Sequence, residues 1–164
     1  MPKTATKAAD NVFYKARIEA SSYNKSLKSR ESTSEATGID RTRLAYIELD
    51  NINPHPEEVL ILSKAYNAPE LCNHFCSKIC PLGIHTVNTV EVNELEKTVL
   101  QLLSVFQGLP EIKSELIDIA ADGVIDREER PQMDEIMRKL DVASDKIKAL
   151  KIYLLKHCGN RTIY

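Results

Sequence analysis

Three cysteines stand four residues apart at Cys72, Cys76 and Cys80, and His85 follows shortly after. Thiolates and imidazoles bind zinc and thiolates hold iron–sulfur clusters, so the three cysteines and His85 are candidate metal ligands, with Cys158 as an alternative fourth ligand. The C-x3-C-x3-C spacing differs from the C-x2-C pairs of common zinc sites. A four-residue period also places small apolar thiols on one helix face. We favour this buried stripe; a zinc or iron–sulfur site and a redox-sensing thiol are the alternatives.

The segment DIAADGVIDREE carries the acidic pattern of a calcium-binding loop. Its carboxylates fall on loop positions 1, 5, 9 and 12, which are Asp118, Asp122, Asp126 and Glu129. Position 3, which normally supplies an oxygen ligand, is Ala120, and this loss severely weakens calcium binding. We therefore favour a D-G turn between two helices, with Asp126 and Glu129 forming a capping box.

A third group of polar residues has the chemistry for binding double-stranded DNA. Arginine forms paired hydrogen bonds with guanine or with phosphate, and threonine can touch the methyl group of thymine. The first residues of a helix direct backbone amides at a phosphate. The candidate DNA-binding residues are Ser29, Arg30, Arg41, Thr42, Arg43, Tyr46, Asn51 and Asn53.

Two short helices joined by a tight turn are needed to present these residues. Ser29 is a good N-cap, Gly38 suits a helix end, and Asp40 can cap a second helix over RTRLAYIEL. An internal apolar wedge would fix the angle between the helices, and the sequence offers Ala36, Ile39, Leu44 and Ile47. This arrangement is that of a helix-turn-helix, whose second helix enters the major groove.

Further helices are expected on both sides of this pair. Asp10 or Asn11 can cap a first helix, and the prolines of DNINPHP end the helix that precedes them. Helical patterns then run over EEVLILSKAYN and PELCNHFCSKIC, with Pro69 in the first turn of the latter. The first domain is therefore a five-helix unit over residues 8–80.

The segment SRESTSEATGIDRTRLAYIELDNINP resembles the lambda-repressor-like (xenobiotic-response-element type) helix-turn-helix family. That family has a G-[VI]-S-x-x-x-[IL]-x-x-[IL]-E core followed by a loop that ends in proline, and the matching residues are Gly38, Ile39, Leu44, Ile47, Glu48 and Pro54. The similarity covers about residues 10–67, and the chain departs from the pattern at Thr33, Asp40 and Asp50. The whole chain is also similar to bacterial regulators with an appended helical domain. The resemblance implies that Arg30 and the helix from Arg41 to Tyr46 face DNA.

Residues 81–89, with Pro81 and Gly83, read as a linker before a second helical domain at 90–158. A seam with heptad spacing comprises Val92, Leu95, Val99, Leu102, Phe106 and Leu109. Gly108 and Pro110 are expected to stop this helix, and a second helix is expected over about 111–121. Further helices should carry Met133, Ile136, Met137 and Leu140, and then Ile147, Leu150 and Leu154. Because of Pro131, the first of these begins near Arg130 or is kinked.

Composition limits what the chain of 164 residues can do. Its 22 Lys and Arg against 24 Asp and Glu give a net charge of −2, so any DNA contact must depend on a few placed side chains. Residues 1–50 carry a net +2 and residues 86–164 a net −3. Only five glycines are present, which disfavours nucleotide-binding loops, and the sequence has neither a nucleophile elbow nor an H-E-x-x-H motif.

The expectation is an all-α protein: a five-helix lambda-repressor-like DNA-binding domain followed by a small helical bundle. No apolar run is long enough for a membrane span and no signal peptide is apparent, so we expect a cytoplasmic protein with no membrane contact. We expect a non-enzymatic transcriptional regulator that acts as a homodimer and requires no cofactor, and we favour a repressor over an activator. Residues 90–158 would serve self-association or bind a protein partner. The alternatives are a protein-interaction adaptor with a degenerate helix-turn-helix, and a metal- or redox-responsive regulator that uses the cysteines.

Overall fold

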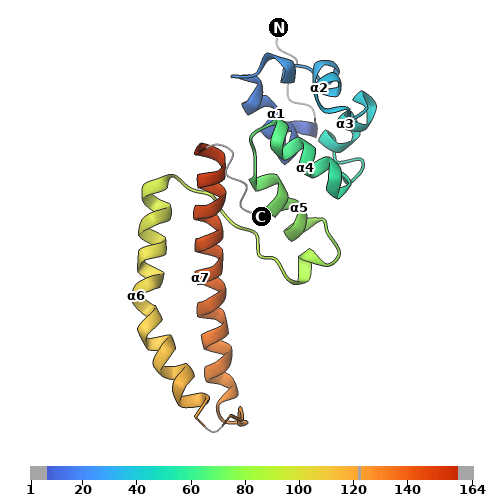
Figure 1. Ribbon diagram of the computed structural model, residues 1–164. Helices are drawn as coiled ribbons and strands as arrows, with labels where there is room; N and C mark the ends of the chain where they lie inside the picture. The colour runs from blue at the N-terminus through green and yellow to red at the C-terminus, as the bar shows by residue number, and fades with distance from the viewer. Residues whose placement is uncertain (1–6, 122, 159–164) are drawn as a thin grey trace. The chain divides into compact units, whose positions relative to one another are not determined.

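A computed structural model describes residues 7–121 and 123–158 of the chain. The chain divides into two compact units, Met1–Thr89 and Val90–Tyr164, hereafter unit 1 and unit 2 (Figure 1). Every regular element in the described ranges is helical, which confirms the all-α prediction. None of the helices formed by these residues is both long and apolar enough to cross a membrane.

Unit 1 contains five α-helices and three short 3-10 helices among its described residues. In chain order these are η1 (Lys7–Asp10), α1 (Val12–Ser21), η2 (Lys25–Leu27), α2 (Arg30–Thr37), α3 (Arg41–Glu48), α4 (Pro56–Ala65), α5 (Glu70–Lys78) and η3 (Gly83–His85). The five α-helices lie where the sequence predicts them. η3 falls within the predicted linker and packs closely against α5. A Cβ added at Gly83 would lie 2.1 Å from the carbonyl oxygen of Cys76.

Local side-chain chemistry sets where these helices begin. The Asn11 side chain accepts a hydrogen bond from the Tyr14 amide, so Asn11 caps α1. Ser29 caps α2 by accepting from the amide of Ser32, and Asp40 caps α3. Each bond satisfies an amide that has no partner inside its helix, which stabilises the helix start by about 1 kcal/mol. The predicted caps at Ser29 and Asp40 are confirmed.

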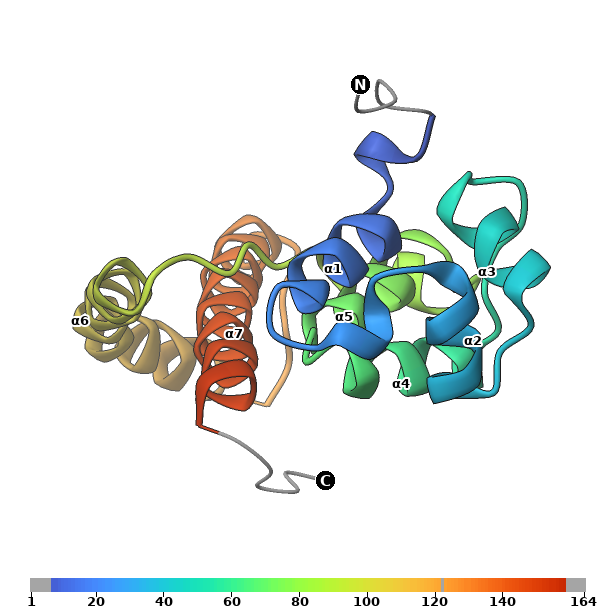
Figure 2. The same cartoon turned by 90° about the horizontal axis from the view of Figure 1, so that it is seen from above.

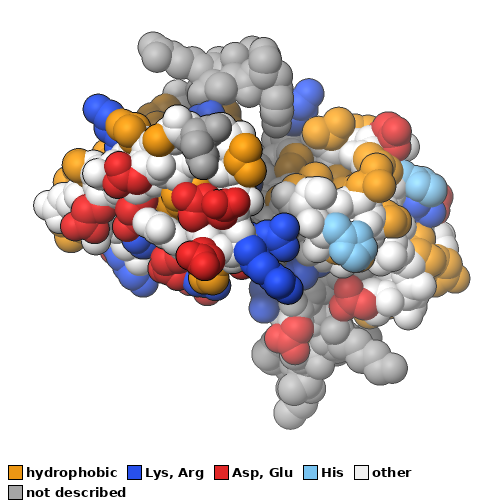
Figure 3. Space-filling model, turned by 90° about the horizontal axis from the view of Figure 1, so that it is seen from below, with side chains coloured by type: hydrophobic (Ala, Val, Ile, Leu, Met, Phe, Trp, Pro, Cys, Tyr) orange, Lys and Arg blue, Asp and Glu red, His pale blue; other side chains and the backbone are white. Residues whose placement is uncertain are grey.

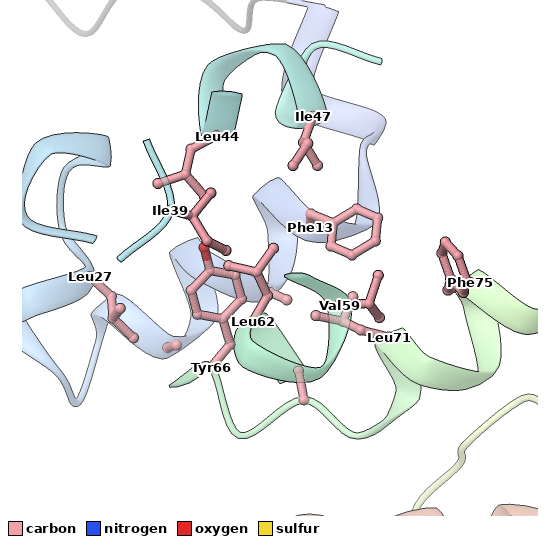
Figure 4. Packing of buried hydrophobic residues seen from close by; sticks show 13 residues of the cluster. Phe13, Leu27, Ile39, Leu44, Ile47, Val59, Leu62, Tyr66, Leu71 and Phe75 are labelled. Atoms are coloured by element: carbon pink, nitrogen blue, oxygen red, sulfur yellow. The ribbon is translucent and has the colours of Figure 1, made fainter. Parts of the chain in front are cut away.

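One apolar core holds the helices of unit 1 together. Phe13 from α1, Ile47 from α3 and Leu62 from α4 point toward one another in its centre (Figure 4). The other members include Leu27, Ile39, Leu44, Val59, Tyr66, Leu71 and Phe75. Three of the four predicted wedge residues, Ile39, Leu44 and Ile47, are therefore buried, whereas the prediction is wrong for Ala36, which is exposed on α2. Thr33 is also fully buried, and its hydroxyl donates to the carbonyl oxygen of Ser29.

Unit 2 consists of two long helices, α6 (Leu95–Ile119) and α7 (Arg130–His157), which lie side by side (Figure 1, Figure 2). They run antiparallel: Lys146 donates to Gln101 at 3.1 Å, and Lys139 lies 3.5 Å from Glu115. The prediction of a small bundle with three or more helices is therefore wrong for the described residues. α7 begins at Arg130 with Pro131 in its first turn, as one of the two predicted alternatives requires.

The predicted helix end at Gly108 and Pro110 is also wrong, because α6 continues through both residues to Ile119. Proline removes one backbone donor and strains the preceding turn, but it does not force the chain to reverse. Both halves of α6 contribute to the contact with α7: Leu102 is buried before the proline, and Ile112 and Ile119 are buried after it. This packing offsets the cost of the interior proline. The two groups of apolar residues predicted on separate helices after Arg130 likewise share α7.

Candidate nucleic-acid interface

The turn between α2 and α3 places the second helix of the pair. Gly38 has φ of 73°, in the left-handed region that favours glycine, and its amide donates to the carbonyl oxygen of Ser34 at 2.8 Å. Asp40 then accepts hydrogen bonds from the amides of Thr42 at 2.8 Å and Arg43 at 3.1 Å. The amides of Arg43 and Thr42 hold the pKa of the Asp40 carboxyl below its ordinary value. Hydrogen bonds thus fix the turn at the end of α2 and at the start of α3.

α3 has one face in the core and one face in solvent. Leu44, Ile47 and Glu48 are buried. Arg41, Thr42 and Tyr46 are exposed, and Tyr46 exposes 47% of its surface although it is aromatic. The sequence predicts Arg41, Thr42, Arg43 and Tyr46 on the solvent face; the first two and Tyr46 lie there, and Arg43 is half-buried. This face offers a guanidinium group, a threonine hydroxyl and methyl group, and a phenol ring, which can contact base edges and the sugar–phosphate backbone.

A buried ion pair fixes the inner face of α3. Arg17 of α1 donates through Nε to Glu48 Oε1 at 2.5 Å and through Nη2 to Oε2 at 3.0 Å. The same guanidinium donates to the carbonyl oxygens of Leu27 and Lys28 at 3.2 and 3.3 Å. Burial lowers the pKa of Arg17, but the hydrogen bonds and charge of Glu48 outweigh burial and raise it above the ordinary value. Glu48 and Arg17 expose 1% and 4% of their surfaces, so the pair links α1, α3 and the chain before α2 inside the core.

Arg30, a candidate DNA ligand, belongs to the same network. Its Nε donates to Glu48 Oε2 at 2.7 Å, while 30% of its side chain remains exposed. Glu48 therefore holds two arginines, one buried and one at the surface. A guanidinium has five N–H donors, so Arg30 keeps donors for a second acceptor such as a phosphate oxygen.

Arg43, also a candidate, is paired with Glu58 of α4. Its Nη2 donates to Glu58 Oε2 at 2.7 Å, and its Nε donates to Oε1. Glu58 Oε2 also accepts from the amide of His55 at 2.6 Å. Burial raises the pKa of Glu58, but the bonds from Arg43 and His55 outweigh it and lower the pKa. Glu58 raises the pKa of Arg43 through a hydrogen bond. The pair anchors α3 to the start of α4 and leaves Arg43 partly exposed.

A shallow hollow with several basic residues lies where α1, α2 and α3 meet. Its volume is about 380 Å³, and its lining includes Lys28, Arg30 and Arg41 with the first residues of α2. Arg41 Nε lies 3.9 Å from an oxygen of Glu31, and both side chains are largely exposed. The N-terminal amides of a helix and three cations at one place favour an anion. Glu31 also lines the hollow, so the cations outnumber one carboxylate there, and the hollow is a candidate site for a phosphate group.

Asn51 and Asn53 lie exposed in the loop after α3. The loop leaves the helix through Asp50, whose φ is 56°, and the amide of Asn51 donates to the carbonyl oxygen of Tyr46 at 2.9 Å. Asp50 also accepts from the side chain of Asn11 at 2.7 Å. These bonds hold the loop beside the end of α3, on the same segment as the candidate side chains.

The cysteines of α5 contact the core of unit 1. Cys72, Cys76 and Cys80 are half-buried and pack against its apolar cluster, as expected for an apolar stripe. Cys72 donates a weak hydrogen bond to the Ser63 hydroxyl at 3.4 Å. Burial raises the pKa of the Cys76 thiol, and the neighbouring Cys80 and Cys72 add to this effect. His85 lies in η3. Within residues 7–121 and 123–158, no three His, Cys, Asp or Glu side chains are grouped as a metal site would require.

The acidic calcium-loop pattern falls at the junction of α6 and α7. Asp118 lies inside α6, and Ala120 is the C-cap of that helix. Asp122 lies outside the described residues. The Asp126 amide donates to the Glu129 carboxylate at 2.9 Å, which is one half of the predicted capping box. Acidic side chains gather at this end of the hairpin (Figure 3). Because Asp118 belongs to a helix, the first ligand position of a calcium loop is not in a loop.

Sequence reasoning missed Arg17 and the intramolecular role of Glu48. Helical periodicity offers a signal for both residues. Glu48 lies four residues after Leu44 and one after Ile47, and Arg17 lies four residues after Phe13, so both fall on apolar helix faces. Two opposite charges at core positions of neighbouring helices indicate a buried pair. Glu58 was missed as the partner of Arg43, for which the sequence offers no signal.

Comparison with protein-family models, with curated proteins and with solved structures finds no match to this chain. The functional assignment therefore depends on the geometry of the chain itself.

Proposed function

We propose that unit 1 is a lambda-repressor-like helix-turn-helix domain that binds double-stranded DNA in a sequence-specific manner, and that the chain is a non-enzymatic transcriptional regulator. The observation that carries this proposal is the α2–α3 pair. Its turn is closed by Gly38 and Asp40, its inner face is fixed by Glu48, and its outer face presents Arg41, Thr42 and Tyr46. α3 enters the major groove, and the basic hollow beside α2 receives a backbone phosphate.

In this mechanism the base contacts come from α3 and the positioning contacts come from its surroundings. Arg41 reaches a base edge or a phosphate, and the start of α2 with Lys28 and Arg30 binds the backbone. Two copies place their α3 helices in successive major grooves, and occupancy of the site represses transcription. The internal pairing of Arg30 and Arg43 leaves few uncommitted cations, so non-specific affinity is low.

Selection from random-sequence duplexes tests the proposal. The full chain is incubated with duplexes of about 25 random base pairs, long enough for two half-sites one turn apart, and the bound fraction is sequenced over several rounds. Arg41→Ala is then compared with the wild type on the selected duplex by fluorescence anisotropy. We expect a loss of about 1–3 kcal/mol, because one bidentate contact is removed.

Arg127→Ala is the matched control, since Arg127 is an exposed arginine in unit 2. It should bind the selected duplex like the wild type. Equal binding by Arg41→Ala, with the fold intact by circular dichroism, would contradict the role of α3. If no sequence is enriched, the internal pairing of Arg30 and Arg43 instead favours a protein-interaction adaptor built on the same fold.

A further inference from the structure

Unit 2 buries little of its own apolar surface. Its enclosed cluster consists of Ile112, Ile119 and Ile136, with Leu116 and Met133 packed against it. Two helices side by side cannot enclose a larger core, because each covers only one face of the other. Large apolar side chains remain exposed along both helices, among them Phe106, Ile117, Leu140, Ile147 and Leu154.

Most of the heptad seam predicted from the sequence lies outside the contact between α6 and α7. Of its six residues only Leu102 is buried, while Leu95, Phe106 and Leu109 expose 39%, 45% and 37% of their surfaces. The α6 residues that cluster with Ile136 of α7 are Ile112 and Ile119, and they are rotated away from this seam. α6 therefore has two apolar stripes, and the one with heptad spacing stays largely exposed within the described part of unit 2.

Apolar residues of α7 lie on the same side of the hairpin as the heptad seam of α6. Leu109 of α6 and Leu140 of α7 line one groove of about 780 Å³ together with Phe106 and Ile117. Residues seven apart share a helix face, so Ile147 and Leu154 extend the stripe from Leu140, each 39% exposed. Lys113 is the one charged side chain among the described residues that line the groove. We call this surface, with Leu95, Phe106, Leu109, Leu140, Ile147 and Leu154, the open face.

The opposite side of the hairpin has more charge. The groove there has about half the volume, about 400 Å³, and its lining combines the apolar Val105, Ile112 and Val142 with four charged residues, Glu111, Glu135, Arg138 and Lys139. The asymmetry between the two grooves resembles that of two helices taken from a larger bundle, with one side turned to the bundle core and the other to solvent.

We propose that the open face binds the open face of a second copy of this chain, so that α6 and α7 of two protomers form a four-helix bundle. A two-fold axis brings one surface onto itself, so each stripe of heptad spacing meets a stripe of the same spacing. The proposal is independent of DNA binding, because it follows from unit 2 alone.

The area of the open face suits a stable dimer. α6 has 25 residues, and at 1.5 Å per residue it is about 38 Å long. Two helices side by side are about 20 Å wide, which gives a face of about 760 Å² per protomer. A stable interface of standard size buries about 800 Å² on each partner. An acidic unit repels its copy, but the groove itself contains no carboxylate among its described lining residues, so the contact is apolar at its centre.

Sedimentation equilibrium of the full chain without DNA tests the proposal. We expect a dimer at tens of micromolar, and we expect it to persist at high salt, since salt screens the repulsion and leaves the apolar contact in place. Phe106→Glu and Leu140→Glu should each weaken the dimer by about 100-fold or more, because each substitution occurs twice in a symmetric interface.

Leu100→Glu and Val142→Glu are the matched controls. Both residues are apolar and at least half exposed on the same two helices, and Val142 lines the charged groove. These variants should remain dimeric. Should an open-face variant fail to fold, the wild-type chain still provides a test: the melting temperature of a dimer rises with protein concentration, whereas that of a monomer does not.

Three results would overturn the proposal: a monomeric wild-type chain, a dimer that survives Phe106→Glu and Leu140→Glu in folded protein, or a dimer that the control variants also dissociate. A monomeric chain that binds its selected duplex would refute the open-face dimer and leave the DNA-binding proposal standing. A dimer without sequence-specific DNA binding would do the reverse.

Discussion

Replacement of Glu48 by alanine is the sharpest test of how α3 is held in place. Glu48 accepts two hydrogen bonds from Arg17 and one from Arg30, and it exposes 1% of its surface. Glu48→Ala removes all three acceptor contacts. Arg17 then remains as a buried cation that keeps the carbonyl oxygens of Leu27 and Lys28 as hydrogen-bond acceptors and the Tyr14 ring 5.5 Å away.

The expected loss of stability follows from this geometry. Removal of one partner from a buried ion pair costs about 3–5 kcal/mol, because the other charge stays buried without compensation. Arg30 adds little, since its partly exposed head can turn to water. The two carbonyl oxygens still serve Arg17, which places the loss near the lower end, at about 3 kcal/mol.

Urea unfolding followed by near-ultraviolet circular dichroism measures this loss in the full chain. Tyr14, Tyr23, Tyr46 and Tyr66 all belong to unit 1, so the tyrosine signal reports mainly on that unit. Glu31→Ala is the control, because Glu31 is an exposed carboxylate 3.9 Å from Arg41 and its removal should leave the unfolding free energy unchanged.

A Glu48→Ala variant with wild-type stability would refute the reasoning. A second variant separates the loss of the pair from the burial of an unpaired charge. Arg17→Met combined with Glu48→Leu removes both charges and keeps apolar volume, so it should recover much of the stability that Glu48→Ala loses. If the double variant is less stable than Glu48→Ala, the unpaired Arg17 is not the cause of the loss.

Three further outcomes follow from the contacts. The wild type should be more stable than Glu58→Gln at neutral pH. Because the pKa of Glu58 is lowered in the folded state, this advantage is complete above about pH 4.5 and is lost as the pH falls through the folded-state pKa. Unfolding curves recorded at a series of acidic pH values will measure it. Pro110→Ala should stabilise unit 2 by about 1–3 kcal/mol, since an amide donor returns to the interior of α6, and an unchanged or lower melting temperature would contradict this. Because burial raises the pKa of the Cys76 thiol, iodoacetamide at pH 7 should label the exposed Cys158 before Cys76, as mass spectrometry will show. Faster labelling of Cys76 would contradict the raised pKa of its thiol.

Local signals in the sequence were sufficient to predict the helices of unit 1. Ser29, Gly38 and Asp40 have side chains or backbone freedom that act within three or four residues, so their effect does not depend on the rest of the fold. The exposed positions of Arg41, Thr42 and Tyr46 then follow from helical periodicity once Leu44 and Ile47 are placed in the core.

Contacts between distant segments were beyond such reasoning. The partner of Arg43 is Glu58, fifteen positions later on another helix, and no short-range pattern pairs them. The local cost of Pro110 predicts a helix end, whereas the packing of Ile112 and Ile119 on α7, which offsets this cost, depends on the antiparallel register. The sequence predicts the heptad seam, but only the three-dimensional structure shows that most of it faces away from α7.

Sequence-specific recognition of DNA is tested most directly by the affinities of the full chain for two duplexes. One is the duplex selected by the protein, and the other is a scrambled duplex of the same length and base composition. At about 0.15 M salt, where electrostatic attraction to phosphate is largely screened, we expect the selected duplex to bind at least about 1,000-fold more tightly. Equal dissociation constants for the two duplexes would contradict the assignment of α3 as a recognition helix.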